Sequence, residues 1–460
     1  MTARLVAVAL AVLAVGAAVV AAWPSARNGA PGRAPVTAPA LDAARVPFFL
    51  SDKVAGIRLG QRLDAVVAGR GQSCLTVDDG RGPTVYSQRP DLPLLPASNL
   101  KLLTATAVLD RIPATERLRT ELRTSGPPVN GVITGDVWLV GAGDPLLATA
   151  DFASQAGYQH QPRPSTALED LAGKVAAAGV RQIQGRILGD ESRYDTQRLV
   201  PTWTPSYLSA GEVGPMSALT VNDNFAQWTP KLVPAPAPAA NTAAVLARLL
   251  QQRGVPVGGT GVAAAPPTAT TVVSAVDSAP IGDVVGVMLT QSDNLAAELL
   301  TKELGRRFGG AGTTAAGLGV VRAVLDRLHM PTAGVVMADG SGLDRSDRAT
   351  CQVLLSAVER GGEAASMGRL PVAGATGTLF HRFVGSPLKG RLWAKTGTLN
   401  GAAAFTGWLS TAQNRQLAFS FLVNGIGSED EGHALEDRIA SALSTYPEAP
   451  PWTALTGSAR

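Results

Sequence analysis

The chain has 460 residues, of which 45% are hydrophobic and 17% are charged, and its formal net charge at pH 7 is +4. This composition excludes an intrinsically disordered chain, and so small a net charge does not indicate a nucleic-acid-binding surface. The length allows two or three domains with a large core.

An apolar segment opens the chain. Residues 5–22 carry no charge, follow a single arginine and end in small residues that suit cleavage by a signal peptidase. The segment is also close to the lower limit of length for a membrane-spanning helix. We therefore expect residues 1–22 to be a signal peptide or a retained anchor that contacts a membrane, and residues 23–45, rich in alanine and proline, to be a linker. Both alternatives place the rest of the chain outside the cytoplasm, in the cell envelope.

Two cysteines, Cys74 and Cys351, occur in the chain. In an exported protein such a pair forms either a disulfide or two buried thiols, and the sequence leaves both alternatives open. The four histidines show no metal-ligand spacing, so we expect neither a metal nor a cofactor.

Residues 46–118 predict the first part of a folded domain. Strands are expected at 73–77 and 84–87, on either side of a turn that contains glycine and aspartate. A helix is expected to begin at Pro96, because the first turn of a helix tolerates proline.

A candidate nucleophile and base lie in the first turn of that helix. Ser98 and Lys101 are three residues apart, so they share one helix face with about 5–6 Å between their Cβ atoms. A lysine whose pKa is lowered by burial or by neighbouring positive charge can deprotonate a serine hydroxyl. The same spacing recurs at Ser386 and Lys389, but the neighbouring proline and glycine predict a turn before a strand there.

Residues 119–274 predict an inserted, mostly β domain, because short strands and turns replace the helical pattern. The expected elements are strands within 131–139 and at 181–188, a helix at 168–178, a polyproline-like connector at 231–238 and a helix at 242–253 capped by Asn241.

After residue 274 the chain returns to helical periodicity and then to strands. The expected helices are 281–290, 292–306, 314–329, 347–360 and 431–446, and the expected strands are 390–396, 401–410 and 415–424. We therefore assign residues 46–118 and 275–446 to one domain and residues 447–460 to a tail.

Two short motifs in this second part have both a structural and a chemical interpretation. Ser292-Asp293-Asn294 supplies preferred helix-capping residues, but also a hydroxyl that relays protons and an amide that binds a carbonyl. Lys395-Thr396-Gly397-Thr398 precedes a hairpin turn, but its ammonium and hydroxyl groups also suit a substrate carboxylate, and its glycine permits a close backbone approach.

The motifs Ser-x-x-Lys, Ser-Asp-Asn and Lys-Thr-Gly occur here in the order found in penicillin-binding proteins and class A β-lactamases. The chain resembles the low-molecular-mass penicillin-binding proteins of class C, which are D-alanyl-D-alanine carboxypeptidases and endopeptidases with a domain inserted after the serine helix. The resemblance covers residues 46–446 and includes the further stretches Gly141–Pro145, Gly189–Asp195, Val221–Asn224, Asp339–Leu343, Leu370–Gly374 and Gly377–Leu379.

This resemblance implies an α+β fold, in which a penicillin-binding transpeptidase domain with an antiparallel sheet flanked by helices carries a second, inserted, mostly β domain. It implies a serine D-Ala-D-Ala carboxypeptidase that hydrolyses peptidoglycan stem peptides through an acyl-enzyme and is inhibited by β-lactams. It leaves the balance with endopeptidase activity open, and the oligomeric state unknown.

The resemblance also implies a role for each motif residue. The catalytic residues are the nucleophile Ser98, the base Lys101 and the proton relay Ser292. The substrate-binding residues are Asn294, which holds the substrate backbone, Thr396 and Thr398, whose hydroxyls receive the terminal carboxylate, and Lys395 and Gly397 of the same motif. The charge of Lys395 also tunes the proton relay of Ser292. Backbone N–H groups of Ser98 and Thr398 form the oxyanion hole, and the ammonium of Lys395 is expected to lower the pKa of Lys101.

Other functions remain as alternatives. A serine β-lactamase has the same fold, and a catalytically silent wall-binding scaffold would keep the motifs as structure. A Gly-x-Ser-x-Gly elbow is absent, which disfavours an α/β-hydrolase. Glycoside hydrolysis by Asp190 and Asp195 is also disfavoured, because acidic residues are common in turns.

Overall fold

The structure is a computed structural model, and it describes residues 48–81, 84–155, 164–360 and 369–448. The predicted leader, the predicted linker and all but the first two residues of the predicted tail lie outside these ranges. In the part of the chain that is described, no helix has both the length and the hydropathy needed to cross a membrane.

One sheet of five strands is antiparallel throughout. Its strands, in spatial order, are β13 (Leu392–Leu399), β14 (Ala402–Ser410), β15 (Gln416–Asn424), β1 (Ser73–Asp78) and β2 (Tyr86–Gln88). The predicted strands are confirmed, although β13 continues through the Lys-Thr-Gly motif to Leu399 instead of ending at Thr396. Because β13 is the first strand of the sheet, the motif lies on an edge.

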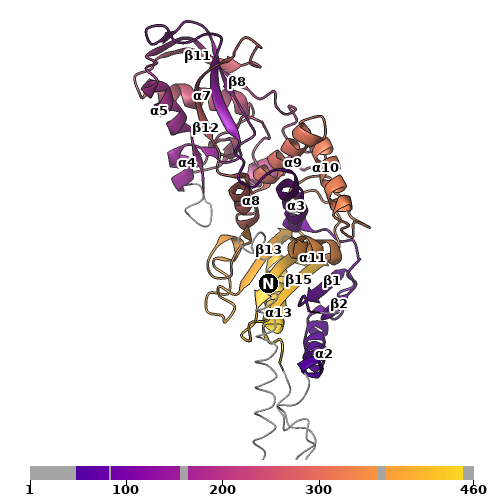
Figure 1. Ribbon diagram of the computed structural model, residues 1–460. Helices are drawn as coiled ribbons and strands as arrows, with labels where there is room; N and C mark the ends of the chain where they lie inside the picture. Colours follow the sequence, from indigo (N-terminus) through magenta and orange to yellow (C-terminus); the bar gives the residue numbers. More distant parts are fainter. Residues whose placement is uncertain (1–47, 82–83, 156–163, 361–368, 449–460) are drawn as a thin grey trace, which may run out of the picture. The chain divides into compact units, whose positions relative to one another are not determined.

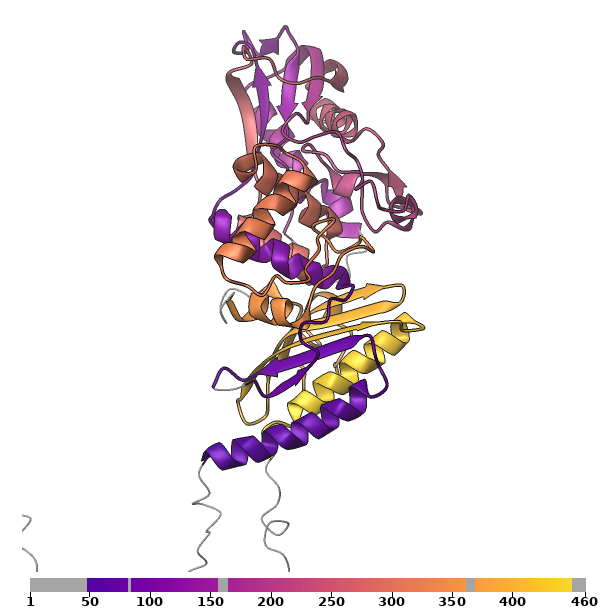
Figure 2. The same ribbon diagram turned by 90° about the vertical axis from the view of Figure 1, so that its right-hand side faces the viewer.

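Side chains of this sheet alternate between two hydrophobic cores. Leu75 and Val77 face a core formed with α2 (Phe48–Val67) and α13 (Glu429–Ser444), which lie side by side against this face in Figure 2. Cys74, at the intervening position, belongs to the core on the opposite face. This period of two follows from the pleat of a strand and lets one sheet support two helical layers.

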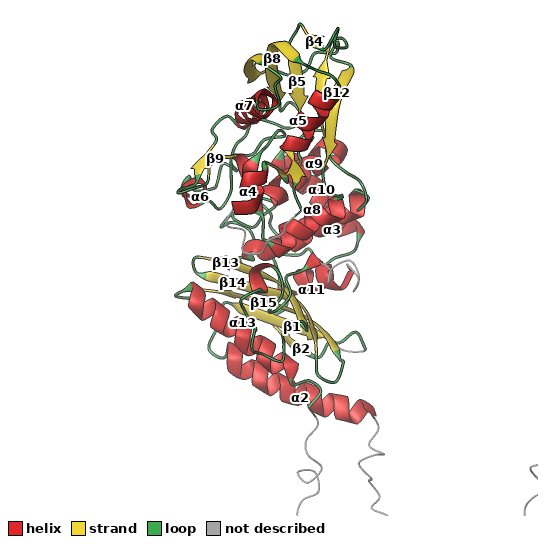
Figure 3. Cartoon of the chain, turned by 90° about the vertical axis from the view of Figure 1, so that its left-hand side faces the viewer, coloured by secondary structure: helices red, strands yellow, loops and turns green. Residues whose placement is uncertain are grey.

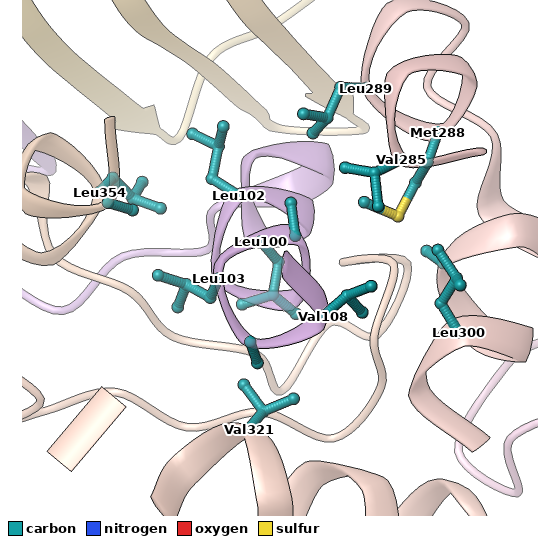
Figure 4. Packing of buried hydrophobic residues seen from close by; sticks show 14 of the residues in the cluster. Leu100, Leu102, Leu103, Val108, Val285, Met288, Leu289, Leu300, Val321 and Leu354 are labelled. Atoms are coloured by element: carbon teal, nitrogen blue, oxygen red, sulfur yellow. The ribbon is translucent and has the colours of Figure 1, made fainter. Parts of the chain in front are cut away.

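A layer of helices covers the opposite face (Figure 1). It contains α3 (Lys101–Arg111), α8 (Ile281–Thr290), α9 (Asn294–Phe308), α10 (Thr314–Arg327) and α11 (Cys351–Arg360). Figure 4 shows α3 at the centre of this layer, with its side chains among Val285, Met288, Leu300, Val321 and Leu354 of the neighbouring helices. Packing on several sides fixes the position of the first turn of α3, where Lys101 lies. The predicted α+β fold is confirmed.

A second sheet with its own core is built within residues 119–277. Its strands are β11 (Val257–Val262), β8 (Gln182–Asp190), β5 (Val137–Val140), β3 (Arg119–Thr124) and β12 (Thr271–Asp277), in spatial order, with β4 (Val132–Ile133) also paired to β8. Strand β8 is parallel to β4, β5 and β11, whereas β3 is antiparallel to β5 and β12. Helices α5 (Leu168–Ala177) and α7 (Pro238–Gln251) pack on this sheet (Figure 3).

Helix α7 begins earlier than the sequence analysis predicted. Pro238 occupies its first turn, so Asn241 lies inside the helix and is not its cap. The hydroxyl of Thr242 donates to the backbone carbonyl of Pro238 at 2.9 Å. Strand β12 also runs past residue 274, and we therefore propose that the inserted segment ends at Asp277; the domain bounds remain a prediction.

Apolar and ionic contacts join the insert to α9. The apolar contacts are made by Trp203, Val213 and Met216 of the insert with Leu295 and Leu299 of the helix. In addition, Arg193 donates to the buried carboxylate of Glu303 at 2.6 Å, and Asp195 pairs with Lys302. The Ser-Asp-Asn motif leads into α9 and supplies its first residue, Asn294, so these contacts hold the insert beside the motif.

A disulfide joins Cys74 of β1 to Cys351 at the start of α11, which resolves the alternative that the sequence left open. Both cysteines are fully buried. The bond connects the central sheet to the helical layer and closes a loop of 277 residues that contains the whole insert.

Removing this disulfide is expected to destabilise the protein. Cross-links that close long loops restrict the unfolded chain most, and the loss of a native disulfide costs about 2–5 kcal/mol. We predict that Cys74→Ala combined with Cys351→Ala lowers the midpoint of thermal unfolding. An unchanged midpoint in the double variant would contradict the prediction, and the oxidised parent is the control.

Candidate active site

Ser98 lies in a tight turn that leads directly into α3. The predicted helix start is divided in two: a 3₁₀ turn covers Ala97–Leu100, and the α-helix begins at Lys101. Ala97 adopts a left-handed conformation with φ of 47°, which is strained for a residue with a Cβ atom. This turn brings the hydroxyl of Ser98 to 2.9 Å from Nζ of Lys101.

The amine of Lys101 is fully buried and has polar partners from three segments. Besides Ser98, it donates to Oδ1 of Asn294 at 2.6 Å and to the backbone carbonyl of Ser341 at 2.7 Å. Both of these oxygens only accept hydrogen bonds. A neutral amine has two N–H groups and one lone pair, so when both N–H groups are used in this way the lone pair is left for the hydroxyl of Ser98.

Burial lowers the pKa of Lys101 to about 8, and this effect outweighs the opposing influence of nearby carboxylates, of which Asp339 is the strongest. The sequence left two causes open for this lowered pKa, burial and a neighbouring positive charge. The structure assigns the main cause to desolvation. An amine with a pKa near neutrality is neutral in a useful fraction of molecules and can accept a proton.

The Ser-Asp-Asn motif serves as a helix cap and contributes to the site. Asp293 is the N-cap of α9 and accepts from the backbone N–H of Ala296 at 2.9 Å. Ser292 has φ of 58°, a second strained position beside the cavity. Asn294 donates from Nδ2 to the backbone carbonyl of Glu212 at 2.8 Å, which orients its Oδ1 toward Lys101.

The Lys-Thr-Gly motif meets the other two on β13. Nζ of the fully buried Lys395 lies 2.9 Å from the hydroxyl of Ser292 and donates to the backbone carbonyl of Thr396 at 2.5 Å. Burial lowers the pKa of Lys395 well below its usual value, and the charge of Lys101 lowers it further. The hydroxyl of Thr396 is hydrogen-bonded to that of Thr378 at 2.7 Å.

A cavity of about 660 Å³ opens above the two lysines. The predicted residues that line it are Ser98, Ser292, Asn294, Thr396, Gly397 and Thr398. The side chains of Lys101 and Lys395 lie beneath this surface, fully buried. The structure therefore brings together all eight residues that the sequence analysis selected, along the exposed edge of β13.

Several supporting groups were not predicted. Asp339 is fully buried and accepts from the backbone N–H groups of Ser341 and Gly342 at 3.1 and 2.6 Å and from Nε1 of Trp203 at 2.8 Å. It thereby holds the turn whose carbonyl binds Lys101. Glu298 accepts from the next residue of that turn, Gly340, at 2.9 Å. The only sequence signal for these groups is the Asp-Gly-Ser-Gly-Leu stretch noted above.

The other candidate pairs in the sequence have structural explanations. Asp190 accepts from the backbone N–H groups of Ser192 and Ala265, each at 2.8 Å, and Asp195 pairs with Lys302. Ser386 lies in a turn, with its backbone carbonyl accepting from the N–H of residue 389 at 3.1 Å. No group of described residues has the composition and spacing of a metal site.

These contacts define a class of protein: a serine hydrolase in which buried lysine amines replace the histidine and aspartate of other serine peptidases. The D-Ala-D-Ala carboxypeptidase 3 (S13) family model matches residues 63–236 and 226–446. The chain therefore belongs to this family, and it is a serine-type D-Ala-D-Ala carboxypeptidase.

Relatives of known identity cover most of the chain. Carboxypeptidase DacB of Mycolicibacterium smegmatis is 29% identical over 95% of this chain and 96% of its own. The D-alanyl-D-alanine carboxypeptidase of an Actinomadura species is 29% identical over 83% of each chain. The crystal structure of penicillin binding protein 4 from Haemophilus influenzae shares the fold, with a TM-score of 0.71 and 19% identity over 84% of this chain and 99% of that one.

Gly397 allows β13 to approach the serine turn closely. A Cβ atom at this position would lie 3.0 Å from the backbone nitrogen of Ser98 and 3.1 Å from the carbonyl of Pro96. We predict that Gly397→Val displaces the nucleophile and lowers the rate of D-Ala release by about 10²-fold, because small misplacements of reacting groups are costly. The matched control is Gly385→Val, where an added Cβ meets nothing within 4 Å. Equal rates for the two variants would contradict the prediction.

Proposed function

We propose that the enzyme cleaves the terminal D-Ala–D-Ala bond of peptidoglycan stem peptides through an acyl-enzyme on Ser98. The observation that supports this most directly is the contact between the hydroxyl of Ser98 and the buried amine of Lys101 at 2.9 Å. That contact joins a nucleophile to a base of suitable pKa in the wall of a cavity large enough for a peptide end.

Lys101 accepts the proton of Ser98 as the serine oxygen attacks the carbonyl carbon of the penultimate D-Ala. The developing oxyanion accepts hydrogen bonds from the backbone N–H groups of Ser98 and Thr398. The C–N bond then breaks, and terminal D-Ala leaves as an amine. Before deacylation Lys101 loses the serine proton to solvent in the cavity, and Lys395 regains a proton from solvent. The neutral Lys101 then deprotonates a water that attacks the ester, and it returns this proton to the oxygen of Ser98 as the shortened peptide leaves.

The leaving amine needs a proton, and we propose that Ser292 supplies it. Lys395 lies 2.9 Å from the hydroxyl of Ser292, and burial makes the ammonium of Lys395 a stronger acid than usual because its pKa is lowered. The hydroxyl of Ser292 passes its proton to the leaving nitrogen and is reprotonated from Lys395. This arrangement separates the base that starts acylation from the acid that completes it.

Substrate binding uses the edge of β13. An extended peptide can pair with an edge strand, and Thr396 and Thr398 then present their hydroxyls to the terminal carboxylate. Arg382 also lines the cavity as a cation and is held by Glu436 at 2.6 Å. The amide of Asn294 is already bonded to Lys101 and to Glu212, so we propose that it chiefly orients the base, and that its predicted contact with the substrate backbone is secondary.

β-Lactams mimic the acyl-D-Ala-D-Ala end, and we propose that they acylate Ser98. A β-lactam complex of the Haemophilus influenzae relative supports this inference. We also propose that the enzyme works outside the cytoplasm, where its substrate lies, with the N-terminal segment as export signal or membrane anchor. Incubation with a free pentapeptide and with cross-linked muropeptides, followed by mass spectrometry of the products, separates carboxypeptidase from endopeptidase action, and the turnover of β-lactams separates both from a β-lactamase.

Ser98→Ala tests the nucleophile. We predict that this variant loses labelling by a fluorescent penicillin and releases D-Ala from a pentapeptide at least ~10³-fold more slowly, because no acyl-enzyme can form. Ser386→Ala is the matched control, since it removes the serine of the other Ser-x-x-Lys sequence. Labelling of the Ser98→Ala variant at the parental level would refute the assignment.

The pKa of Lys101 predicts the pH dependence of acylation. The base acts only when neutral, and its pKa is about 8. Well below that pH the neutral fraction falls about tenfold per pH unit, so the acylation rate is expected to rise roughly 50-fold from pH 6 to pH 8 and to level off above pH 8. Stopped-flow measurement of penicillin acylation checks this, and a rate independent of pH between 6 and 8 would exclude Lys101 as the base.

A further inference from the structure

A second cavity, of about 510 Å³, lies beside the active-site cavity within the insert. It is formed by α4 (Ala150–Gln155), α7 and β9 (Phe225–Gln227), which Figure 3 shows on one side of the insert, together with Glu169 at the start of α5. Phe225 and Trp228 line both cavities, whereas Ser98 lines only the first. The active-site cavity therefore extends from the nucleophile to the wall of the second cavity, which we call the insert groove.

The wall between the two cavities is rigidly supported. Asn222, Asp223 and Asn224 are all left-handed, with φ of 57°, 50° and 60°. Consecutive left-handed residues other than glycine are costly and persist only when their surroundings fix them. Here Oδ1 of Asn222 accepts from the backbone N–H of Thr149 at 2.8 Å, and Nδ2 of Asn224 donates to the carbonyl of Pro215 at 2.7 Å. The chain then continues into Phe225 and Trp228.

The lining of the insert groove mixes hydrogen-bond donors and acceptors around an indole ring. Its polar side chains include Asp151, Glu169, Asn241, Arg248 and Gln252. Oε1 of Glu169 accepts from the backbone N–H of Ala150 at 2.9 Å, but its Oε2, although buried, has no hydrogen-bond partner among the described residues. A buried carboxylate oxygen without a donor is costly, so a ligand that donates to it gains binding energy.

This chemistry matches a saccharide better than a peptide. Each sugar hydroxyl both donates and accepts, and the apolar face of a sugar ring packs on an aromatic ring. An extended peptide instead presents paired N–H and C=O groups and suits an edge strand, which the site provides at β13.

We infer that the insert groove binds the N-acetylated sugars of the peptidoglycan glycan strand while the attached stem peptide occupies the active-site cavity. The inference rests on the proposed function, because it assumes that the stem peptide occupies the active-site cavity and that the sugar lies beyond the peptide. Four residues of extended peptide span roughly 14 Å, so the sugar that carries the stem lies well beyond the scissile bond. Phe225 and Trp228, which line both cavities, connect the active-site cavity to the groove. The insert thus contributes substrate specificity to the enzyme.

Glu169→Gln and Arg248→Gln test the inference through substrate preference. The first variant keeps the acceptor for Ala150 but replaces the unpaired carboxylate oxygen. For each variant, kcat/KM is measured with a disaccharide-linked pentapeptide and with the free pentapeptide. We expect the ratio of the two values to fall about tenfold, the effect of losing one hydrogen bond to a charged group. Asp170→Asn, an exposed change on the same helix outside the groove, is the matched control and keeps the parental ratio.

Direct binding makes the test independent of catalysis. The peptide-free disaccharide is titrated calorimetrically into the Ser98→Ala protein, and Glu169→Gln in that background is expected to weaken binding about tenfold. The absence of any binding, or affinities and ratios that Glu169→Gln leaves unchanged, would overturn the inference. An equal loss with a cross-linked peptide that carries no sugar would also overturn it, since the groove would then hold a second stem peptide. If the parent enzyme failed to hydrolyse the pentapeptide, that result would count against the proposed function. The calorimetric titration of the disaccharide would still decide whether the insert groove binds sugar.

Discussion

The site depends on keeping one amine out of water. Lys101 begins a helix that is packed on several sides, and its amine lies fully buried among Ser98, Asn294 and the Ser341 carbonyl. Burial lowers the pKa of the amine to about 8, so a useful fraction of it is neutral near pH 7 and is still basic enough to accept a proton. The central sheet, the helical layer and the insert each contribute to the surroundings of this amine. The fold as a whole therefore keeps water away from it.

Strain and tight approach recur where the three motifs meet. Ala97 and Ser292 both have left-handed backbones, and Gly397 sits where β13 passes the serine turn closely. Each of these features costs stability, and the surrounding packing and the disulfide between β1 and α11 offset that cost. The side chains of the three motifs are thus held in their reactive positions before the substrate binds. Electrostatic preorganisation requires this arrangement.

The sequence predicted the residues of the candidate site better than it predicted the structure that surrounds and positions them. Ser98, Lys101, Ser292 and Lys395 were found because their types and order carry a specific signal, and the second-half elements followed from clear periodicity. The sequence named burial and neighbouring positive charge as causes of a lowered pKa at Lys101, but it did not decide between them, because burial depends on contacts between distant segments. Strand β11 was missed because its glycines weaken the periodicity, and the start of α7 was missed because Pro238 was assigned to a connector. Strand β12 was also missed, although it contains no glycine.

The insert makes one contact with the active site through a backbone atom and not through a side chain. Asn294 is oriented by the carbonyl oxygen of Glu212, and every amino acid offers the same oxygen. A survey of single substitutions at this position would therefore overlook the bond, whereas shortening or lengthening the loop by one residue would remove it. This hydrogen bond between Asn294 and the insert therefore depends on the length of the loop and not on its amino-acid sequence. Chimeras that exchange inserts between related enzymes will have to match this length.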